Sequence, residues 1–283
     1  MQPQYPLPSL KQVFVHSYRL FKFRADKLFL WMGGLQILLA GLAWVLGIND
    51  NPGQSLGSAL GIMFFGLFSS ALGIFVFIAV SFLLKTTVEK ENKTFGEVIT
   101  LARPKFWPLI GAALLVTAAV TAVLLATVLL IVLLFVLFGN GVFSSVLATL
   151  VALGVSVFLL AAVIYITFFN LAIVLQDVPV LKSFRYSFNL VKGRFWRVFG
   201  FYLSLAVIVL LIALATLVIQ FLCSMLYVLS PVLAGVLIWL LSLLLGVCSS
   251  AYAQCATVVF YMNAAGMVTT APEPAATEEN DLL

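Results

Sequence analysis

Charge is scarce in this chain. Only 9% of its 283 residues are charged, whereas 64% are hydrophobic. Soluble domains carry about 25% charged residues, so water cannot be the main solvent of this chain. The net charge is +5, but the basic residues are dispersed between apolar runs. A nucleic-acid site needs a dense basic face, so we predict no nucleic-acid partner.

Side chains suited to catalysis or metal binding are also few. The single histidine, His16, and the three cysteines, Cys223, Cys248 and Cys255, contain no CxxC pair and no zinc-ligand spacing. All ten acidic residues lie outside the long apolar runs, which disfavours ion coupling through an intramembrane carboxylate. We therefore predict no catalytic residue, no cofactor and no metal site, and a protein that is not an enzyme.

Long apolar runs are what the chain has in abundance. A helix needs about 20 apolar residues to cross the hydrocarbon core of a bilayer, because its backbone groups must be paired internally there. Six runs reach that length. They cover approximately residues 28–46, 59–84, 109–137, 142–173, 198–222 and 232–262.

The basic residues lie before the first run and in every second connection between the runs after it. Five lie within residues 11–27, five within 85–105 and five within 182–197, which accounts for all 15. The connections on the opposite side hold none, and Asp50 is their one charged residue. Basic loops stay in the cytoplasm, so both termini are predicted to be cytoplasmic.

The same pattern precedes the first, third and fifth runs. A cation and two large apolar residues are followed by a glycine four residues later; we call the first three residues the basic-aromatic triplets. They are Lys27-Leu28-Phe29 before Gly33, Lys105-Phe106-Trp107 before Gly111, and Arg194-Phe195-Trp196 before Gly200. The aromatic rings suit the headgroup boundary, the cations suit lipid phosphate, and the glycines would allow close helix approach. Two interpretations stay open. The triplets either simply anchor the helices at the membrane surface or form a specific site for anionic phospholipid; the candidate residues of that site are Lys27, Lys105, Phe106, Trp107, Arg194, Phe195, Trp196 and Arg197.

The triplets divide the chain into repeats. We predict an all-α, polytopic membrane bundle of six transmembrane helices in three parallel hairpin repeats, each preceded by a cytoplasmic interfacial amphipathic helix. Residues 1–262 form one membrane domain, with repeats at about 9–84, 94–173 and 179–262. The acidic segment 263–283 cannot bury enough apolar surface to fold, so we expect a disordered cytoplasmic tail.

Four segments suggest a family. The segments 175–179, 183–192 and 193–197 and the run Val258-Val259-Phe260-Tyr261 resemble the YciC-type bacterial inner-membrane proteins. They are similar also to the membrane domain attached to some glycerophosphodiester phosphodiesterases. The resemblance implies a bacterial inner, or cytoplasmic, membrane; it does not define a biochemical role.

Two classes of function remain open. The first is a non-enzymatic protein of envelope or lipid homeostasis that contacts phospholipids, preferably anionic ones, or acts as a scaffold for a membrane-protein partner or a second copy. The second is an uncoupled permease or channel for a neutral or amphipathic solute. That class would need a polar cavity lined by residues such as Asn170, Tyr252 and Gln254, although hydrogen bonds between helices would equally satisfy these groups.

Overall fold

A computed structural model describes residues 9–45, 56–89, 93–225 and 230–267, and every regular element in these ranges is a helix. In chain order the helices are α1 (Leu10–Phe23), α2 (Ala25–Leu28), the π-helical turn η1 (Phe29–Gly33), α3 (Gly34–Val45), α4 (Leu56–Val88), α5 (Phe95–Phe138), α6 (Val142–Ile166), α7 (Phe169–Gln176), α8 (Val180–Val191), α9 (Phe195–Ser224) and α10 (Pro231–Ala264). The predicted position of Asp50 and the predicted tail from residue 268 onward lie outside the described residues; 263 and 264 still belong to α10.

Six stretches of the described chain are long and apolar enough to cross a membrane. They are Ala25–Ala43, Gly61–Val88, Gly96–Phe138, Val142–Gln176, Phe195–Ser224 and Ala234–Ala264. These stretches overlap the six predicted runs. The third begins at Gly96, 13 residues before the predicted start at about 109, and the fourth is interrupted at residues 167–168, between α6 and α7.

The second repeat differs from the predicted arrangement. No separate helix precedes its first span, because residues 95–103 form the first turns of α5, which continues through Pro104 and Pro108. A proline removes one backbone donor and bends a helix without always ending it. Val98 and Ala102, one turn apart, are buried against the core, and this packing keeps the first turns in line with the rest.

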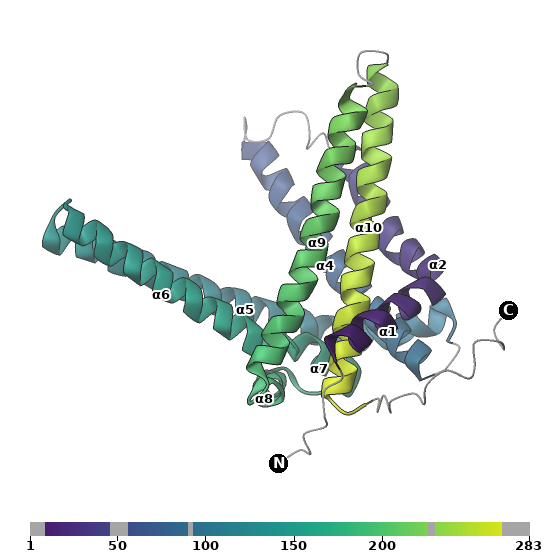
Figure 1. Cartoon of the computed structure of the whole chain (residues 1–283), viewed down its shortest axis with the longest axis horizontal. Helices are drawn as coiled ribbons and strands as arrows, with labels where there is room; N and C mark the ends of the chain where they lie inside the picture. The colour runs from purple at the N-terminus through teal and green to yellow at the C-terminus, as the bar shows by residue number, and fades with distance from the viewer. Residues whose placement is uncertain (1–8, 46–55, 90–92, 226–229, 268–283) are drawn as a thin grey trace.

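Three helical hairpins diverge from a common base (Figure 1). We call the hairpins arms: α3 pairs with α4, α5 with α6 and α9 with α10. The base consists of α1, α2, α7 and α8 together with the adjoining ends of α4, α5, α9 and α10. Helix α1 crosses α10 in the base, and α7 and α8 pack against each other.

An aromatic cluster forms the centre of the base. Phe201 of α9 stacks on Phe260 of α10 with ring centroids 4.3 Å apart, and Phe168 lies 5.9 Å from Phe260. Phe14 of α1 stacks on Phe201 at 5.7 Å. Phe168, Phe201 and Phe260 are almost fully buried. The cluster therefore joins α1, the α6–α7 junction, α9 and α10 through contacts between segments far apart in the sequence.

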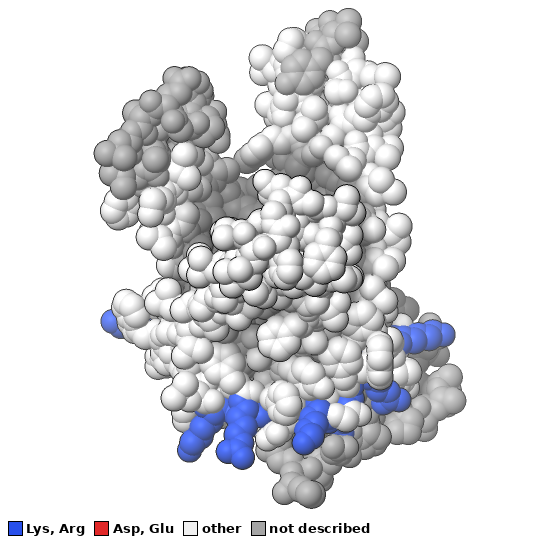
Figure 2. All heavy atoms as spheres, turned by 90° about the vertical axis from the view of Figure 1, so that its left-hand side faces the viewer, with Lys and Arg blue, Asp and Glu red and all other residues white. Residues whose placement is uncertain are grey.

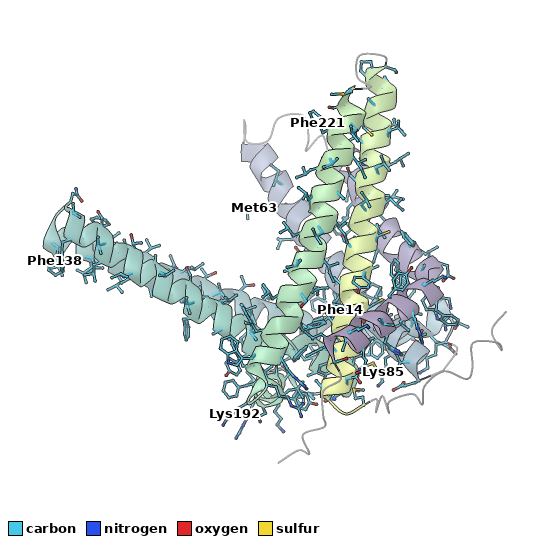
Figure 3. The ribbon with its side chains drawn as sticks, viewed as in Figure 1. Phe14, Met63, Lys85, Phe138, Lys192 and Phe221 are labelled. Carbon is cyan, nitrogen blue, oxygen red and sulfur yellow. The ribbon has the colours of Figure 1, made fainter. Side chains whose placement is uncertain are left out.

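The arms have the opposite character. Met63, Phe138 and Phe221, one on each arm, are large apolar side chains that point away from the protein (Figure 3). Exposed apolar surface on this scale is unfavourable in water and favourable in lipid. On the face shown in Figure 2, by contrast, the lysines and arginines gather at the base, away from the arm tips. The described chain thus separates apolar arms from a basic base.

Candidate lipid interface at the base

The second and third basic-aromatic triplets have nearly the same geometry. In each, the cation and the phenylalanine are half-buried. The tryptophan is exposed, Trp107 by 73% and Trp196 by 78%. The Phe and Trp rings meet edge to face with centroids 5.6 Å apart in both triplets. Tryptophans held outward beside a cation suit the boundary between headgroups and acyl chains.

The first triplet is arranged differently. Leu28 is fully buried, and Phe29 is half-buried with its ring 6.3 Å from that of Phe21. Phe29 opens the π-helical turn η1, and Trp31 within that turn lies 6.3 Å from Phe75 of α4. Lys27 is half-buried. The three triplets therefore match in sequence, but only two of them present an exposed aromatic ring.

Lys105 is engaged within the protein. Its ammonium pairs with the carboxylate of Asp177, and its side chain is only 17% exposed. Lys85 of α4 donates to the carbonyl of Leu175 at 3.2 Å. Both lysines thus meet the C-terminal end of α7, where the helix dipole favours positive charge. Lys105 has a structural role here, and its contact with lipid remains a prediction.

Positive charge is concentrated where α9 begins. Gly193 adopts the left-handed conformation, φ 82°, and turns the chain from α8 into α9. Arg194 follows it and is half-buried, and Arg197 is exposed. Burial lowers the pKa of Arg194, and the nearby charge of Arg197 lowers the pKa further. An anion bound beside these two guanidinium groups would offset the effect of Arg197 on Arg194 and favour the charged form of Arg194.

A buried serine of α8 forms hydrogen bonds to backbone groups at the interruption between α6 and α7. The sequence did not single out this serine as a link between the helices. The hydroxyl of Ser187, on α8, donates to the carbonyl of Tyr165 at 2.9 Å and accepts from the amide of Phe168 at 3.1 Å. Ser187 and Phe168 are fully buried. The serine thus pairs two backbone groups that the interrupted helix leaves open. The partners of the Ser187 hydroxyl lie about twenty residues earlier in the sequence, so no local sequence pattern predicts these bonds.

The α8 helix packs on other helices of the protein through two phenylalanines. Phe184 stacks on Phe169 of α7 with centroids 4.7 Å apart, and Phe188 stacks on Tyr165 at 4.8 Å. Phe184 is half-buried, while Phe188 keeps an exposed edge. The contacts account for the apolar residues of this face without a membrane, so the interfacial position of α8 remains a prediction.

The glycines that follow the triplets do not mark close helix contacts. A methyl group added at Gly33 would meet Val247 at 3.8 Å, an ordinary contact, and at Gly111 and Gly200 it would meet nothing within 4 Å. The expected close approach is therefore wrong at Gly111 and Gly200. Diverging arms leave open space there instead.

The three residues considered for a polar cavity have different surroundings. Gln254, on α10, donates to the carbonyl of Phe77 at 2.9 Å and to the hydroxyl of Ser81 at 3.2 Å, both on α4. Tyr252, two residues earlier on α10, meets Phe21 of α1 edge to face at 6.4 Å. Asn170 is half-buried on α7. Gln254 and Tyr252 therefore serve contacts with different helices.

Two cavities occur elsewhere. One of about 580 Å³ lies at the tip of the α5–α6 arm, lined by Phe135, Asn140, Gly141, Val142, Ser145, Val146, Thr149 and Leu150. The other, of about 300 Å³, lies in the base and is lined by Lys27, Leu30, Trp31, Leu83, Lys93 and Val98. None of Asn170, Tyr252 and Gln254 lines either cavity. Of these lining residues, the sequence had singled out only Lys27 as a candidate site residue. A cation four residues before a tryptophan is the local signal that could have added Trp31.

The six long apolar helices and their exposed arms define the chain as a multi-pass membrane protein. Within the described ranges, no three His, Cys, Asp or Glu side chains lie close enough together to hold a metal ion. No family model matches the chain, and neither a curated protein nor a solved structure matches it.

Proposed function

We propose that this chain is a non-enzymatic protein of the bacterial inner membrane, with both termini in the cytoplasm, which binds anionic phospholipid at its base and acts in envelope or lipid homeostasis. The resemblance to YciC-type proteins supports the choice of membrane. The gathering of cations in the base supports the orientation, because basic segments are retained on the cytoplasmic side.

One observation carries the proposal: two triplets far apart in the sequence repeat the same arrangement of a half-buried cation, a half-buried phenylalanine and an exposed tryptophan. A tryptophan ring exposed by more than 70% at Trp107 and Trp196 is costly in water and favourable at the acyl boundary. Arg194 and Arg197, which adjoin Trp196, then lie at the depth of lipid phosphate, where each contributes about 1 kcal/mol toward an anionic surface. Lys105, beside Trp107, is already paired with Asp177.

The contacts of the polar residues favour this function over a permease. A solute pathway would need polar groups that converge on one cavity. Gln254 instead joins α10 to α4 through two hydrogen bonds, and Tyr252 packs on α1. Hydrogen bonding between helices thus gives Gln254 its role without a solute.

The test compares two double variants that each remove two positive charges from the base. Arg194→Gln/Arg197→Gln removes the pair beside Trp196, and the matched control Lys182→Gln/Arg185→Gln removes two exposed cations of α8. Phospholipid that copurifies with each protein is quantified by mass spectrometry, and circular dichroism verifies folding.

We expect the first variant to weaken retention of anionic lipid by roughly 30-fold, since two contributions of about 1 kcal/mol are lost. The control should retain most of its lipid. Equal losses in the two variants, or no loss in either, would contradict a site at the triplets and leave simple anchoring as their role.

A further inference from the structure

The smaller cavity is lined by residues from several segments of the first and second repeats. Lys27 comes from α2, Leu30 and Trp31 from η1, Leu83 from α4, Lys93 from the α4–α5 connection and Val98 from the first turns of α5. Its volume, about 300 Å³, is at the lower limit of ligand-binding pockets and suits a headgroup better than a whole lipid. The cavity therefore lies where the first and second repeats meet.

The walls of this cavity differ in chemistry. Leu83 and Val98 are almost fully buried and close the inner side, whereas Leu30 is 64% exposed and forms the outer side. Lys27 and Lys93, both half-buried, are the two cationic residues among those that line this cavity. An amphiphile could thus place a phosphate beside the amines and lead its acyl chains out over Leu30.

The surrounding structure holds these groups in place. The ring of Trp31 lies 6.3 Å from Phe75, which in turn lies 6.2 Å from Phe106 of the second triplet. Lys93 directly precedes the capping box of α5, in which the amide of Thr94 donates to the carboxylate of Glu97 at 2.7 Å. Glu97, four residues after Lys93, accepts this bond in the cap, and the charge of Lys93 acts on the Glu97 carboxylate. The ring contact thus holds Trp31 in place, and the cap orders the backbone directly after Lys93, before any ligand binds, which lowers the entropic cost of binding.

We propose that this cavity binds the headgroup of one anionic phospholipid from the cytoplasmic leaflet. The proposal rests on the proposed function for its membrane and orientation and adds a single, saturable site to it. Two lysines favour a phosphodiester with a neutral polar headgroup, such as phosphatidylglycerol. A zwitterionic lipid would bring its own positive charge to the same two amines and be disfavoured.

The experiment measures lipid binding to the purified full-length protein by native mass spectrometry in a mild detergent. Phosphatidylglycerol, phosphatidylcholine and soluble glycerol phosphate are titrated separately, and the last is also used as a competitor. The first phosphatidylglycerol should bind saturably and more tightly than phosphatidylcholine. Equal affinity for the two lipids, or displacement of phosphatidylglycerol by glycerol phosphate at similar concentration, would overturn the assignment to a lipid.

Charge-removing variants locate the site. Lys27→Gln/Lys93→Gln should weaken binding of the first phosphatidylglycerol by roughly 30-fold. Lys93→Gln alone, which changes only a loop residue, should weaken this binding by roughly fivefold. The control Lys11→Gln/Lys22→Gln removes two exposed cations of α1 and should weaken it less than threefold. Equal effects in the cavity pair and the control pair would overturn the site.

The two proposals fail in distinguishable ways. Loss of lipid in Arg194→Gln/Arg197→Gln with unchanged binding in Lys27→Gln/Lys93→Gln would overturn the cavity site and leave the proposed function intact. Unchanged binding in both double variants would overturn both. Loss confined to the cavity pair would support the cavity and remove the third triplet from the proposed function.

Discussion

Replacing Ser187 with alanine tests how the base is held together. The Ser187 hydroxyl donates to the carbonyl of Tyr165, in the last turn of α6, and accepts from the amide of Phe168, within the interruption between α6 and α7. Alanine keeps the helical backbone of α8 and removes both bonds at once. The variant therefore isolates one contact between α8 and the fourth span.

The expected cost follows from burial. Ser187 and Phe168 are fully buried, so no water replaces the lost hydroxyl. Leaving a buried donor or acceptor unpaired costs about 1–3 kcal/mol. The Phe168 amide carries this full cost, whereas the carbonyl of the half-buried Tyr165 carries less of it, so the free energy of unfolding should fall by about 1–3 kcal/mol.

Ser183, one turn earlier on α8, provides a matched control. It is equally buried, but its hydroxyl donates only to the carbonyl of Val180, within its own helix, at 2.6 Å. Ser183→Ala should therefore cost less than about 1 kcal/mol. SDS-induced unfolding in mixed micelles, followed by tryptophan fluorescence, measures both variants. Similar losses at the two serines would refute the argument that Ser187 joins α8 to the fourth span.

Three further perturbations test the arrangement of the chain. Phe201→Ala removes a ring from the buried cluster and should lower the free energy of unfolding by about 3–5 kcal/mol in the same titration. Phe221→Ala, on the exposed arm of the same helix, should change the free energy of unfolding by less than about 0.5 kcal/mol. Similar values for the two variants would argue against a division into base and arms. Asp177 is left-handed, with φ 58°, so Asp177→Val should lower the stability by about 1–2 kcal/mol more than Asp177→Gly, although both lose the same ion pair; equal unfolding temperatures would contradict this. Once the native cysteines are replaced, a cysteine at Asn140 should react with an impermeant maleimide in intact cells and one at Asn189 should not, and the reverse pattern would invert the proposed orientation.

The membrane-spanning stretches could be predicted from the sequence with good accuracy. Their signal is local, because each span must supply its own apolar length and pair its own backbone. The break between the third and fourth predicted runs, at residues 138–141, coincides with the connection between α5 and α6, where Gly139 adopts φ 70°. Helix α8 also lies before the fifth span, where the sequence predicts a helix.

The candidate site was less predictable, because the three triplets look alike in sequence and differ in burial. Trp107 and Trp196 are exposed, whereas Phe29 packs on Phe21 and the π-helical turn brings Trp31 to the cavity instead. Whether a residue at the end of a span meets lipid or protein depends on which helix crosses beside it. The sequence contains no periodic pattern for that.

The sequence by itself determined how this protein divides between lipid and water, because transfer energies of apolar and charged side chains act residue by residue. Only the tertiary structure decided which polar groups find partners. Lys105 pairs with Asp177, 72 positions away in the sequence, and Gln254 bonds to Ser81, 173 positions away. Ser187 of α8 bonds to backbone groups at the interruption between α6 and α7. These pairings are short-ranged and directional, so they exist only once α4, α5, α7, α8 and α10 have packed into one base.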